Sequence, residues 1–324
     1  MALPTNAFAT YEAIGNRVDL SDMIYRIDPT DTPFMSGVEK AKASAVNHEW
    51  QTQALAAAAV NAQLEGDDAA VDAATATVRL GNIAQISRKV PQVTGTQQAV
   101  DHAGRGNEMA YQEMLKGLEL KRDMETSLIG STGTSTGGGK ISGSDTGVRR
   151  LGPVLSWIHT NTNMSTGTTT GVPGTGDGIT VNIDGTQRAF TEAQLKSVLS
   201  SIWTAGGKPN LIMTGAFNKQ TFSTFTGRAS PIEQASTKKI TAAVDAYESD
   251  FGRLTVAPNR FQRSRDVFVF QMDMWAVAYV NGRRMVSTPL AQVGDSIRRL
   301  ILSEYTLESR NEKANGAVYD LTTS

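Results

Sequence analysis

The sequence predicts an α+β fold made of several extended parts, and three observations carry this prediction. Residues 47–95 alternate apolar and polar side chains on both sides of an acidic tip, which is typical of a long β-hairpin. Residues 96–130 are rich in helix-forming residues and contain no proline, which predicts one long helix. Residues 186–290 alternate helical and strand-like segments, as α/β domains do.

Composition limits the classes of function. The chain has 324 residues, with 31 basic and 32 acidic side chains and a net charge of −1. This balance argues against a dedicated nucleic-acid-binding protein, although it does not exclude local basic surfaces. The absence of cysteine excludes disulfides, thiolate nucleophiles and cysteine zinc sites. We find no targeting segment and no apolar run of membrane-spanning length, so we expect a soluble protein without membrane partners.

Residues 1–46 are predicted to form an irregular N-terminal arm. A short helix is expected over Asp19–Tyr25, where Asp19 or Ser21 supplies the cap. Phe34 and Met35 follow a proline-containing turn and are expected to anchor the arm onto a core. Such an arm either packs on another surface or is a terminus that is tied down locally, and this stretch alone does not decide between the two.

The hairpin of residues 47–95 is the most informative segment. Its return limb places apolar residues at even positions, which predicts one buried strand face, made by Val78, Leu80, Ala84, Ile86 and Val90. The stretch from residue 51 to 78 contains no Lys or Arg but carries four acids, namely Glu65, Asp67, Asp68 and Asp72. Limbs of about 20 extended residues would reach about 65 Å. A lysine-free acidic arm of this reach suits a subunit that contacts its neighbours.

The long helix of residues 96–130 has two apolar groups at helical spacing, the second being Leu120, Met124 and Leu128. Its charged residues, Glu125 among them, are predicted to form a solvated flank of mixed charge. Gly104 and Gly106 weaken the pattern at its start. The following residues, 131–185, are rich in Gly, Thr and Ser, and predict a flexible connection or exposed loops around a short element at 154–159.

The α/β segment, residues 186–290, opens with a capping box formed by Thr191 and Gln194. Helices are expected from there to residue 203 and over residues 216–225 and 237–247. Strands are expected at residues 211–214, 254–257, 267–270 and 275–280. The last part, residues 291–324, contains a strand at 298–307.

Motifs for chemistry are incomplete. Gly137–Lys140 resembles the end of a phosphate-binding loop, but Ile141 stands where a Ser or Thr is required. The pairs at residues 177–178 and 184–185 are interpreted as turns rather than calcium ligands. An enzyme of the α/β part would need a nucleophile, base or metal set, and we find none. We therefore predict no catalytic, cofactor-binding or metal-binding residues, no cofactor, and no enzymatic activity.

The densest basic run contains Arg260, Arg263 and Arg265. Solvated faces and ion pairs between subunits are the favoured interpretation. The alternative is weak contact with nucleic-acid phosphates, which would not read sequence.

Local sequence also resembles a known family. Several segments carry the resemblance, namely Tyr11–Arg17 and Asp31–Met35 in the arm, His48–Thr52 and Arg79–Asn82 in the hairpin, and Leu118–Glu125 in the helix. They look like the tailed-phage major capsid proteins of the Hong Kong 97-type fold, in the podophage SU-ten-like subfamily. Gly215–Gln220, Pro258–Phe261, Gly294–Ser296 and Glu304–Glu308 continue the resemblance. It covers nearly the whole chain except residues 131–184.

The resemblance implies a division of the chain into an N-terminal arm, a projecting E-loop hairpin (47–95), a spine helix of the P-domain (96–130), an insertion (131–185), an A-domain (186–290) and a P-domain return strand (291–324). It implies a major capsid protein that assembles as hexamers and pentamers into an icosahedral shell around double-stranded DNA. A shell of the same fold around protein cargo is the alternative. The expected location is the virion capsid, assembled in the bacterial cytoplasm.

The resemblance also implies partners: other copies of the chain, a portal protein, a decoration protein and packaged DNA held by non-specific contacts. Some relatives form covalent crosslinks through a lysine of the projecting hairpin. Because residues 51–78 contain no lysine, we predict a shell without crosslinks. Some relatives begin with a scaffolding extension, and this chain begins with the arm, so we expect a separate scaffolding protein. We hypothesise that contacts between subunits involve Glu65, Asp67, Asp68, Asp72, Arg79 and Arg88.

Overall fold

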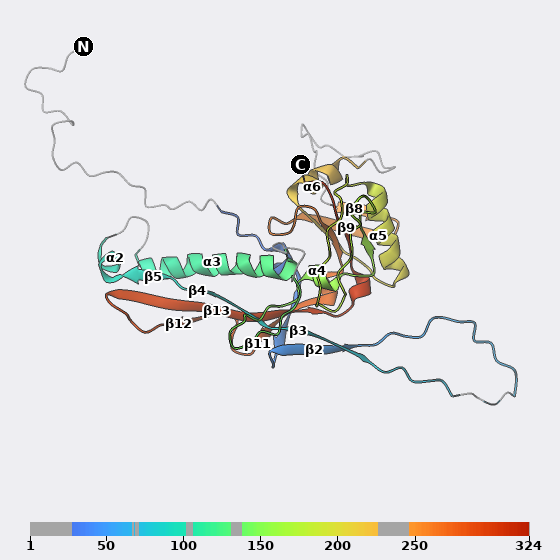
Figure 1. Ribbon diagram of the computed structural model, residues 1–324, viewed down its shortest axis with the longest axis horizontal. Coiled ribbons are helices and arrows are strands. Elements are labelled where there is room, and N and C mark those ends of the chain that lie inside the picture. The colour runs from blue at the N-terminus through green and yellow to red at the C-terminus, as the bar shows by residue number, and fades with distance from the viewer. Residues whose placement is uncertain are drawn as a thin grey trace, which may run out of the picture.

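The computed structural model describes residues 28–66, 68, 71–101, 106–130, 138–225 and 246–323. Three sheets organise these residues: a six-stranded sheet under the long helix, called here the spine sheet, a second six-stranded upper sheet, and a two-stranded hairpin. Figure 1 shows an elongated molecule in which the upper sheet and its helices form a lobe at one end of the spine sheet. The loop between the two strands of the hairpin, β2 (Asn47–Thr52) and β3 (Val78–Ile83), projects beyond that lobe (Figure 1).

The spine sheet is built around its longest strand, β13 (Ser296–Ser309). β13 pairs antiparallel with four strands along its length, namely β4 (Gln85–Lys89), β5 (Gln92–Thr94), β11 (Trp275–Val280) and β12 (Val286–Pro289). The edge strand β1 (Glu39–Ala43) pairs parallel with β11. Segments more than 200 residues apart in the chain therefore share one sheet. The series of strands predicted for residues 186–290 is thus split, because β11 and β12 belong to the spine sheet.

The N-terminal part departs from the predicted irregular arm. Helix α1 (Pro33–Gly37) and strand β1 are ordered elements, and β1 was not expected. Phe34 and Met35 are buried in the main core, as predicted. Phe34 packs against the rings of Phe270 and Trp275 at centroid distances of 5.3 and 6.1 Å. The helix predicted over Asp19–Tyr25 lies outside the described residues.

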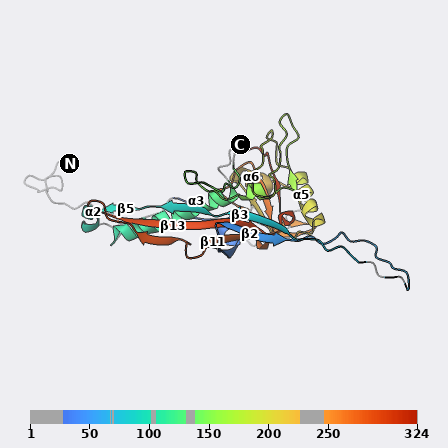
Figure 2. The same cartoon turned by 60° about the horizontal axis from the view of Figure 1, so that its bottom comes forward.

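The long helix is α3 (Glu108–Ile129), which lies along the spine sheet over β13 and β4 (Figures 1 and 2). It begins 12 residues later than predicted, after a short separate helix α2 (Gly95–Ala99). The Asn107 side chain caps it by accepting a hydrogen bond from the Ala110 N–H at 3.0 Å. Gly130 ends it with φ of +93°, a conformation that favours glycine. Leu120, Met124 and Leu128 are buried, as their spacing predicts.

The hairpin consists of β2 (Asn47–Thr52) and β3 (Val78–Ile83), which pair antiparallel. Only six residue pairs form this ladder, so the strands are much shorter than predicted. The predicted buried face is correct only in part: Ala84 is buried and Leu80 is partly buried, but Val78 is 58% exposed. Ile86 and Val90 are each 43% exposed, because Asn82, Ile83 and Ala84 are buried one after another and the alternation changes phase there.

The upper sheet has the order β6 (Thr162–Asn163), β14 (Gly316–Val318), β10 (Val267–Phe270), β7 (Leu211–Thr214), β9 (Gly252–Pro258) and β8 (Ala246–Ser249). Helix α5 (Glu192–Thr204) begins with the predicted capping box and packs on β14 and β6. Helix α6 (Ala216–Ser223) follows β7. The C-terminal strand β14 thus returns to this sheet. The helix predicted at 237–247 is wrong at its end, because residues 246 and 247 lie in β8; the rest lies outside the described residues.

The described part of the Gly/Thr/Ser-rich stretch, residues 138–185, is irregular, and its exposed loops, residues 141–148 among them, surround a short buried helix, which is the second of the two predicted alternatives. Its short helix α4 (Val154–Trp157) is completely buried. Glycines allow the chain to pass very close to itself. A Cβ on Gly139 would lie 1.7 Å from the Ile179 carbonyl oxygen, and one on Gly174 would lie 2.6 Å from that of Leu155. The small residues that suggested flexibility serve close packing here.

Two 3₁₀ helices, η1 (Met272–Met274) and η2 (Glu312–Ala314), complete the secondary structure of the described residues. Within that part of the chain, no helix combines the length and apolarity needed to cross a membrane.

Candidate inter-subunit surface

The loop that joins β2 to β3, residues 53–77, is called here the projecting loop. Figure 1 shows it extending away from the body of the subunit. Its aliphatic side chains are almost fully exposed: Leu55 by 95%, Val60 by 96%, Leu64 by 79% and Val71 by 97%. Four largely exposed aliphatic side chains on one projecting loop fit a surface that another chain covers.

The predicted acidic contact residues lie on this loop. Glu65, Asp68 and Asp72 are all exposed. Asp67 lies outside the described residues. Since the loop has no Lys or Arg, its only formal charges are negative. A partner surface for it must therefore be apolar and neutral or basic.

The two predicted arginines do not join the acids. Arg79 lies on β3 at the base of the loop and forms an ion pair with Glu49 of β2, with its side chain 70% exposed. Arg88 lies on β4, where it is exposed between Ile86 and Val90 on the outer face of the strand. The five predicted contact residues that the structure describes therefore occupy three separate places on one subunit. They can meet only if a second copy brings them together.

The base of the hairpin is tied to β13. His48 Nε2 lies 3.2 Å from Glu308 Oε2, and Arg310 Nε lies 3.1 Å from the other carboxylate oxygen. The hydrogen bond from His48 lowers the pKa of Glu308, against the opposing effect of burial. The charged form of Glu308 is thus held between the two side chains.

The N-terminal segment at Phe34 and Met35 is bound to a buried carboxylate, whose burial the sequence did not predict. Glu125 of α3 was predicted to lie on a solvated flank, but it is fully buried. Its two oxygens accept hydrogen bonds from the backbone N–H groups of Phe34 and Met35 at 2.9 and 2.8 Å, and Oε1 accepts another from Asn259 at 2.8 Å. Burial raises the pKa of Glu125, while these hydrogen bonds oppose the rise. The carboxylate therefore joins the arm, the long helix and the loop after β9.

Two of the three arginines of the basic run, Arg263 and Arg265, form ion pairs within the subunit, which corrects their interpretation as part of a solvated or phosphate-binding face. The guanidinium groups of Arg263 and Arg265 both pair with Asp184, and Arg265 also pairs with Asp320 at 3.0 Å. Arg263 Nε lies 3.1 Å from the fully buried Asp266. Burial raises the pKa of Asp266 to about 7, although Arg263 lowers it. Arg260 remains exposed.

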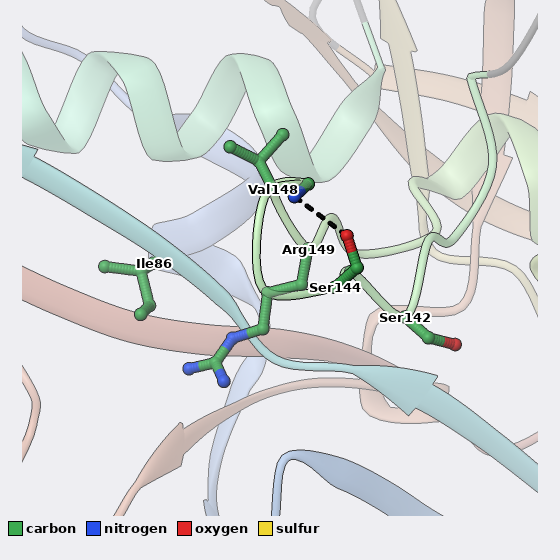
Figure 3. Close-up of a pocket in the computed structure, with 7 residues that line it drawn as sticks. Ile86, Ser142, Ser144, Val148 and Arg149 are labelled. Atoms are coloured by element: carbon green, nitrogen blue, oxygen red, sulfur yellow. Dashed lines mark hydrogen bonds between the residues drawn. The ribbon is translucent and has the colours of Figure 1, made fainter.

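An open hollow of about 430 Å³ lies between β4 and the turn at residues 142–149. Figure 3 shows Ile86 at one side, with the Arg149 side chain extending toward that side and Val148 pointing toward the helix drawn above it. The Ser144 hydroxyl accepts a hydrogen bond from the Gly147 N–H at 2.9 Å, so it stabilises the turn. The Arg149 guanidinium binds the buried carboxylate of Glu304 on β13. The Ser144 hydroxyl and the Arg149 guanidinium are therefore engaged in structural contacts.

Residues considered for chemistry also have structural partners. The Lys140 Nζ donates hydrogen bonds to the carbonyl oxygens of Gly81 and Asp177, so it is not placed to hold a phosphate. Asp177 accepts hydrogen bonds from Thr175 and from the Ile179 N–H, as a turn residue does. Among the residues that the structure describes, no group of three or more His, Asp or Glu side chains is arranged to hold a metal ion.

Comparison with solved structures defines the fold. The fold is similar to the capsid of a native GTA particle, with a TM-score of 0.62 and 8% identity over 95% of this chain and 96% of that one. A chain of Gordonia phage Cozz matches with a TM-score of 0.60 and 9% identity over 99% and 98%. The holo-SrpI encapsulin complex from Synechococcus elongatus matches with a TM-score of 0.56 and 9% identity over 96% and 94%. The chain therefore has the α+β Hong Kong 97-type fold, as predicted.

Sequence comparison then defines the family. The model of the SU10 major capsid protein family matches residues 3–322, so the chain belongs to this family. The major capsid protein of Escherichia phage Phieco32 is 26% identical over 347 residues, covering 98% of each chain. The protein is a bacteriophage major capsid protein, a structural subunit of the virion capsid that associates with copies of itself in a shell. The predicted family is confirmed.

Proposed function

We propose that this subunit forms hexamers and pentamers that close into an icosahedral shell around double-stranded DNA, and that the projecting loop lies on an adjacent copy. The observation that carries the proposal is the near-complete exposure of four aliphatic side chains on a loop that projects from the subunit. Water-exposed aliphatic groups of this kind supply the driving force for association.

Several weak contacts are enough for such a shell. Complete burial of one Leu or Val side chain contributes roughly 1.5–3 kcal/mol, so the four on the loop would contribute several kcal/mol at one interface. Each subunit in a shell meets several neighbours, and multivalency makes the closed particle stable even where single interfaces are weak.

The acidic residues Glu65, Asp67, Asp68 and Asp72 would add electrostatic attraction to Arg and Lys side chains of the neighbour, with Arg79 and Arg88 as the partners that we propose. Arg88 is exposed beside Ile86 and Val90, so it offers a cation within an apolar stripe. Because exposed charge pairs are screened, assembly should weaken as ionic strength rises. The loop has no lysine, which supports a shell without covalent crosslinks.

The remaining partners are proposed from the family. They are a separate scaffolding protein, a portal protein, a decoration protein, and packaged DNA contacted without sequence readout. Assembly would take place in the bacterial cytoplasm. A purely structural role, without catalysis or cofactor, is supported by the structural engagement of Lys140, Asp177 and Asp184.

A second candidate is a shell around protein cargo. The observation that favours it is the fold similarity to the encapsulin complex, at a TM-score of 0.56. Neighbouring genes distinguish the two: portal and terminase genes support the phage shell, and a cargo-enzyme gene supports the compartment. Membership of the SU10 family, over residues 3–322, favours the phage shell.

The test replaces the four exposed aliphatic residues of the loop with Ser. Because these side chains are exposed in the subunit, the thermal midpoint should stay unchanged while electron microscopy shows loss of closed particles. The matched control is Leu55→Met with Leu64→Met, which keeps the loop apolar and should keep assembly. Closed particles from the serine variant in wild-type yield would contradict the proposal.

A further inference from the structure

The direction of the projecting loop needs an explanation, because the hairpin has no sheet to support it. β2 and β3 form a two-stranded sheet that shares no ladder with the other described strands. An isolated two-stranded hairpin is only marginally stable in water. Side-chain contacts must therefore hold it, and His48 bound to Glu308 supplies one on the β13 side.

A second set of contacts comes from residues 138–158, in the Gly/Thr/Ser-rich stretch. The Lys140 Nζ donates one hydrogen bond to the Gly81 carbonyl oxygen at 2.7 Å and another to that of Asp177 at 2.8 Å. It thereby ties β3 to a turn of this stretch. A charged donor strengthens such bonds relative to those of neutral donors.

Asn82, the residue after Gly81, has a fully satisfied buried amide. Its Nδ2 donates to the carbonyl oxygens of Gly152 at 3.0 Å and Leu307 at 2.8 Å. Its Oδ1 accepts from the backbone N–H groups of Gly152 at 2.8 Å and Ile83 at 2.9 Å. One side chain thus joins the hairpin, residues 138–158 and β13. Such a buried network, when complete, rigidifies its surroundings.

Aromatic packing completes the contact. The rings of Trp50 on β2 and the fully buried Trp157 on α4 lie 5.3 Å apart between centroids. The Lys140 Nζ lies 5.8 Å from the centre of the same Trp157 ring. The Trp157 Nε1 donates to the Gly152 carbonyl oxygen at 3.1 Å, which fixes the ring. Both strands of the hairpin are therefore held by one compact region.

We propose that residues 138–158 act as a brace that fixes the direction in which the projecting loop leaves the subunit, with Lys140 and Asn82 as positioning residues. The brace gives a role to part of the Gly/Thr/Ser-rich stretch, whose composition alone assigned it none. Its importance for a shell rests on the proposed function, since a fixed loop direction determines which part of a neighbour the loop reaches. The brace itself is a property of the single subunit.

The absence of native cysteine allows a clean test. Spin labels are placed at Ala76→Cys, two residues before the start of β3, and at Ser201→Cys on α5; both sites are exposed. Pulsed electron paramagnetic resonance on soluble full-length subunits then measures the distribution of distances between the labels. Lys140→Met removes both hydrogen bonds of Nζ but keeps an aliphatic chain beside Trp157. We expect the distribution to become about twofold wider as the hairpin gains freedom.

Lys116→Met is the matched control, because Lys116 is also half-buried and bound, here to Glu119 at 2.7 Å on α3. It should leave the distribution unchanged. Asn82→Ala provides a second broadening variant, and thermal midpoints of all variants separate local loosening from unfolding. An unchanged distribution in a folded Lys140→Met subunit would overturn the brace. The measurement does not depend on shell formation, so failure of the proposed function would be recognised separately by electron microscopy.

Discussion

The carboxylate of Glu125 accepts a hydrogen bond from the backbone N–H of Phe34 at 2.9 Å, across 91 residues of sequence. Its other oxygen binds the next N–H, that of Met35. Among the described residues, no cation pairs with this buried carboxylate; its hydrogen-bond donors are N–H groups, Asn259 among them. The N-terminal segment is therefore attached to the long helix at one polar point, beside the apolar anchor of the Phe34 ring.

Glu125→Ala should destabilise the subunit by about 3 kcal/mol, because it leaves buried N–H groups of Phe34 and Met35 without acceptors. Chemical denaturation measures the loss. Hydrogen exchange should in addition show faster exchange at residues 34–38. Glu248→Ala, at an exposed site on β8, is the control and should change neither quantity. Wild-type protection at residues 34–38 in the Glu125 variant would refute the anchoring role.

The raised pKa of Asp266 leads to a prediction of how the stability of the subunit depends on pH. Burial raises its pKa in the folded subunit to about 7, above its value in the unfolded chain. A raised folded-state pKa means that the stabilising contribution is present at low pH and is lost as pH rises through about 7. The free energy of unfolding should therefore fall by about 1 kcal/mol between pH 6 and pH 8 from this group.

Asp266→Asn removes this titration. The difference in unfolding free energy between wild type and variant, measured by urea denaturation at several pH values, isolates the contribution. As pH rises, the unfolding free energy of the variant should increase relative to that of the wild type. A difference that is constant between pH 6 and pH 8 would show that Asp266 does not titrate there.

Two acids of the spine region should differ strongly in their contribution to stability. Glu304 on β13 is buried and pairs with both Arg149 and Arg283, so Glu304→Ala should cost about 3 kcal/mol by leaving these arginines uncompensated. Asp123 on α3 pairs with Lys89 at 2.8 Å but is half-exposed. Asp123→Ala should cost less than about 1 kcal/mol. Equal losses in thermal denaturation would disprove this ranking.

The lysine-free loop predicts the outcome of a gel experiment. Purified particles boiled in detergent should migrate as one band at the 34.6 kDa mass of the chain. Residues 51–78 contain no lysine for covalent attachment to a neighbour. A ladder of higher bands that persists under these conditions would contradict a shell without crosslinks.

Short-range patterns predicted much of the fold. The capping box of Thr191, the apolar spacing of Leu120, Met124 and Leu128, and the strand at Leu211–Thr214 all depend on neighbouring residues, which a sequence displays directly. The anchoring of Phe34 was also predictable, because a large apolar residue in a polar arm needs a buried site.

Long-range relationships were not predictable in this way. Glu125 lies among charged residues in the sequence, which suggests an exposed position. Its burial is favourable only because Phe34 and Asn259, both distant in sequence, donate hydrogen bonds to its carboxylate. The burial of Trp157 within a glycine-rich stretch depends on contacts with Trp50, far away in sequence. Similarly, β11 joins β1 and β13 rather than its sequence neighbour β10, because sheet pairing is decided by tertiary packing.

Cryo-electron microscopy of particles assembled by the full-length protein, with its scaffolding partner present, tests the central claim most directly. The claim predicts closed icosahedral shells in which residues 53–77 of each subunit lie on an adjacent subunit, with Leu55, Val60, Leu64 and Val71 buried. Small oligomers under every condition, or closed shells in which this loop points into solvent, would contradict it.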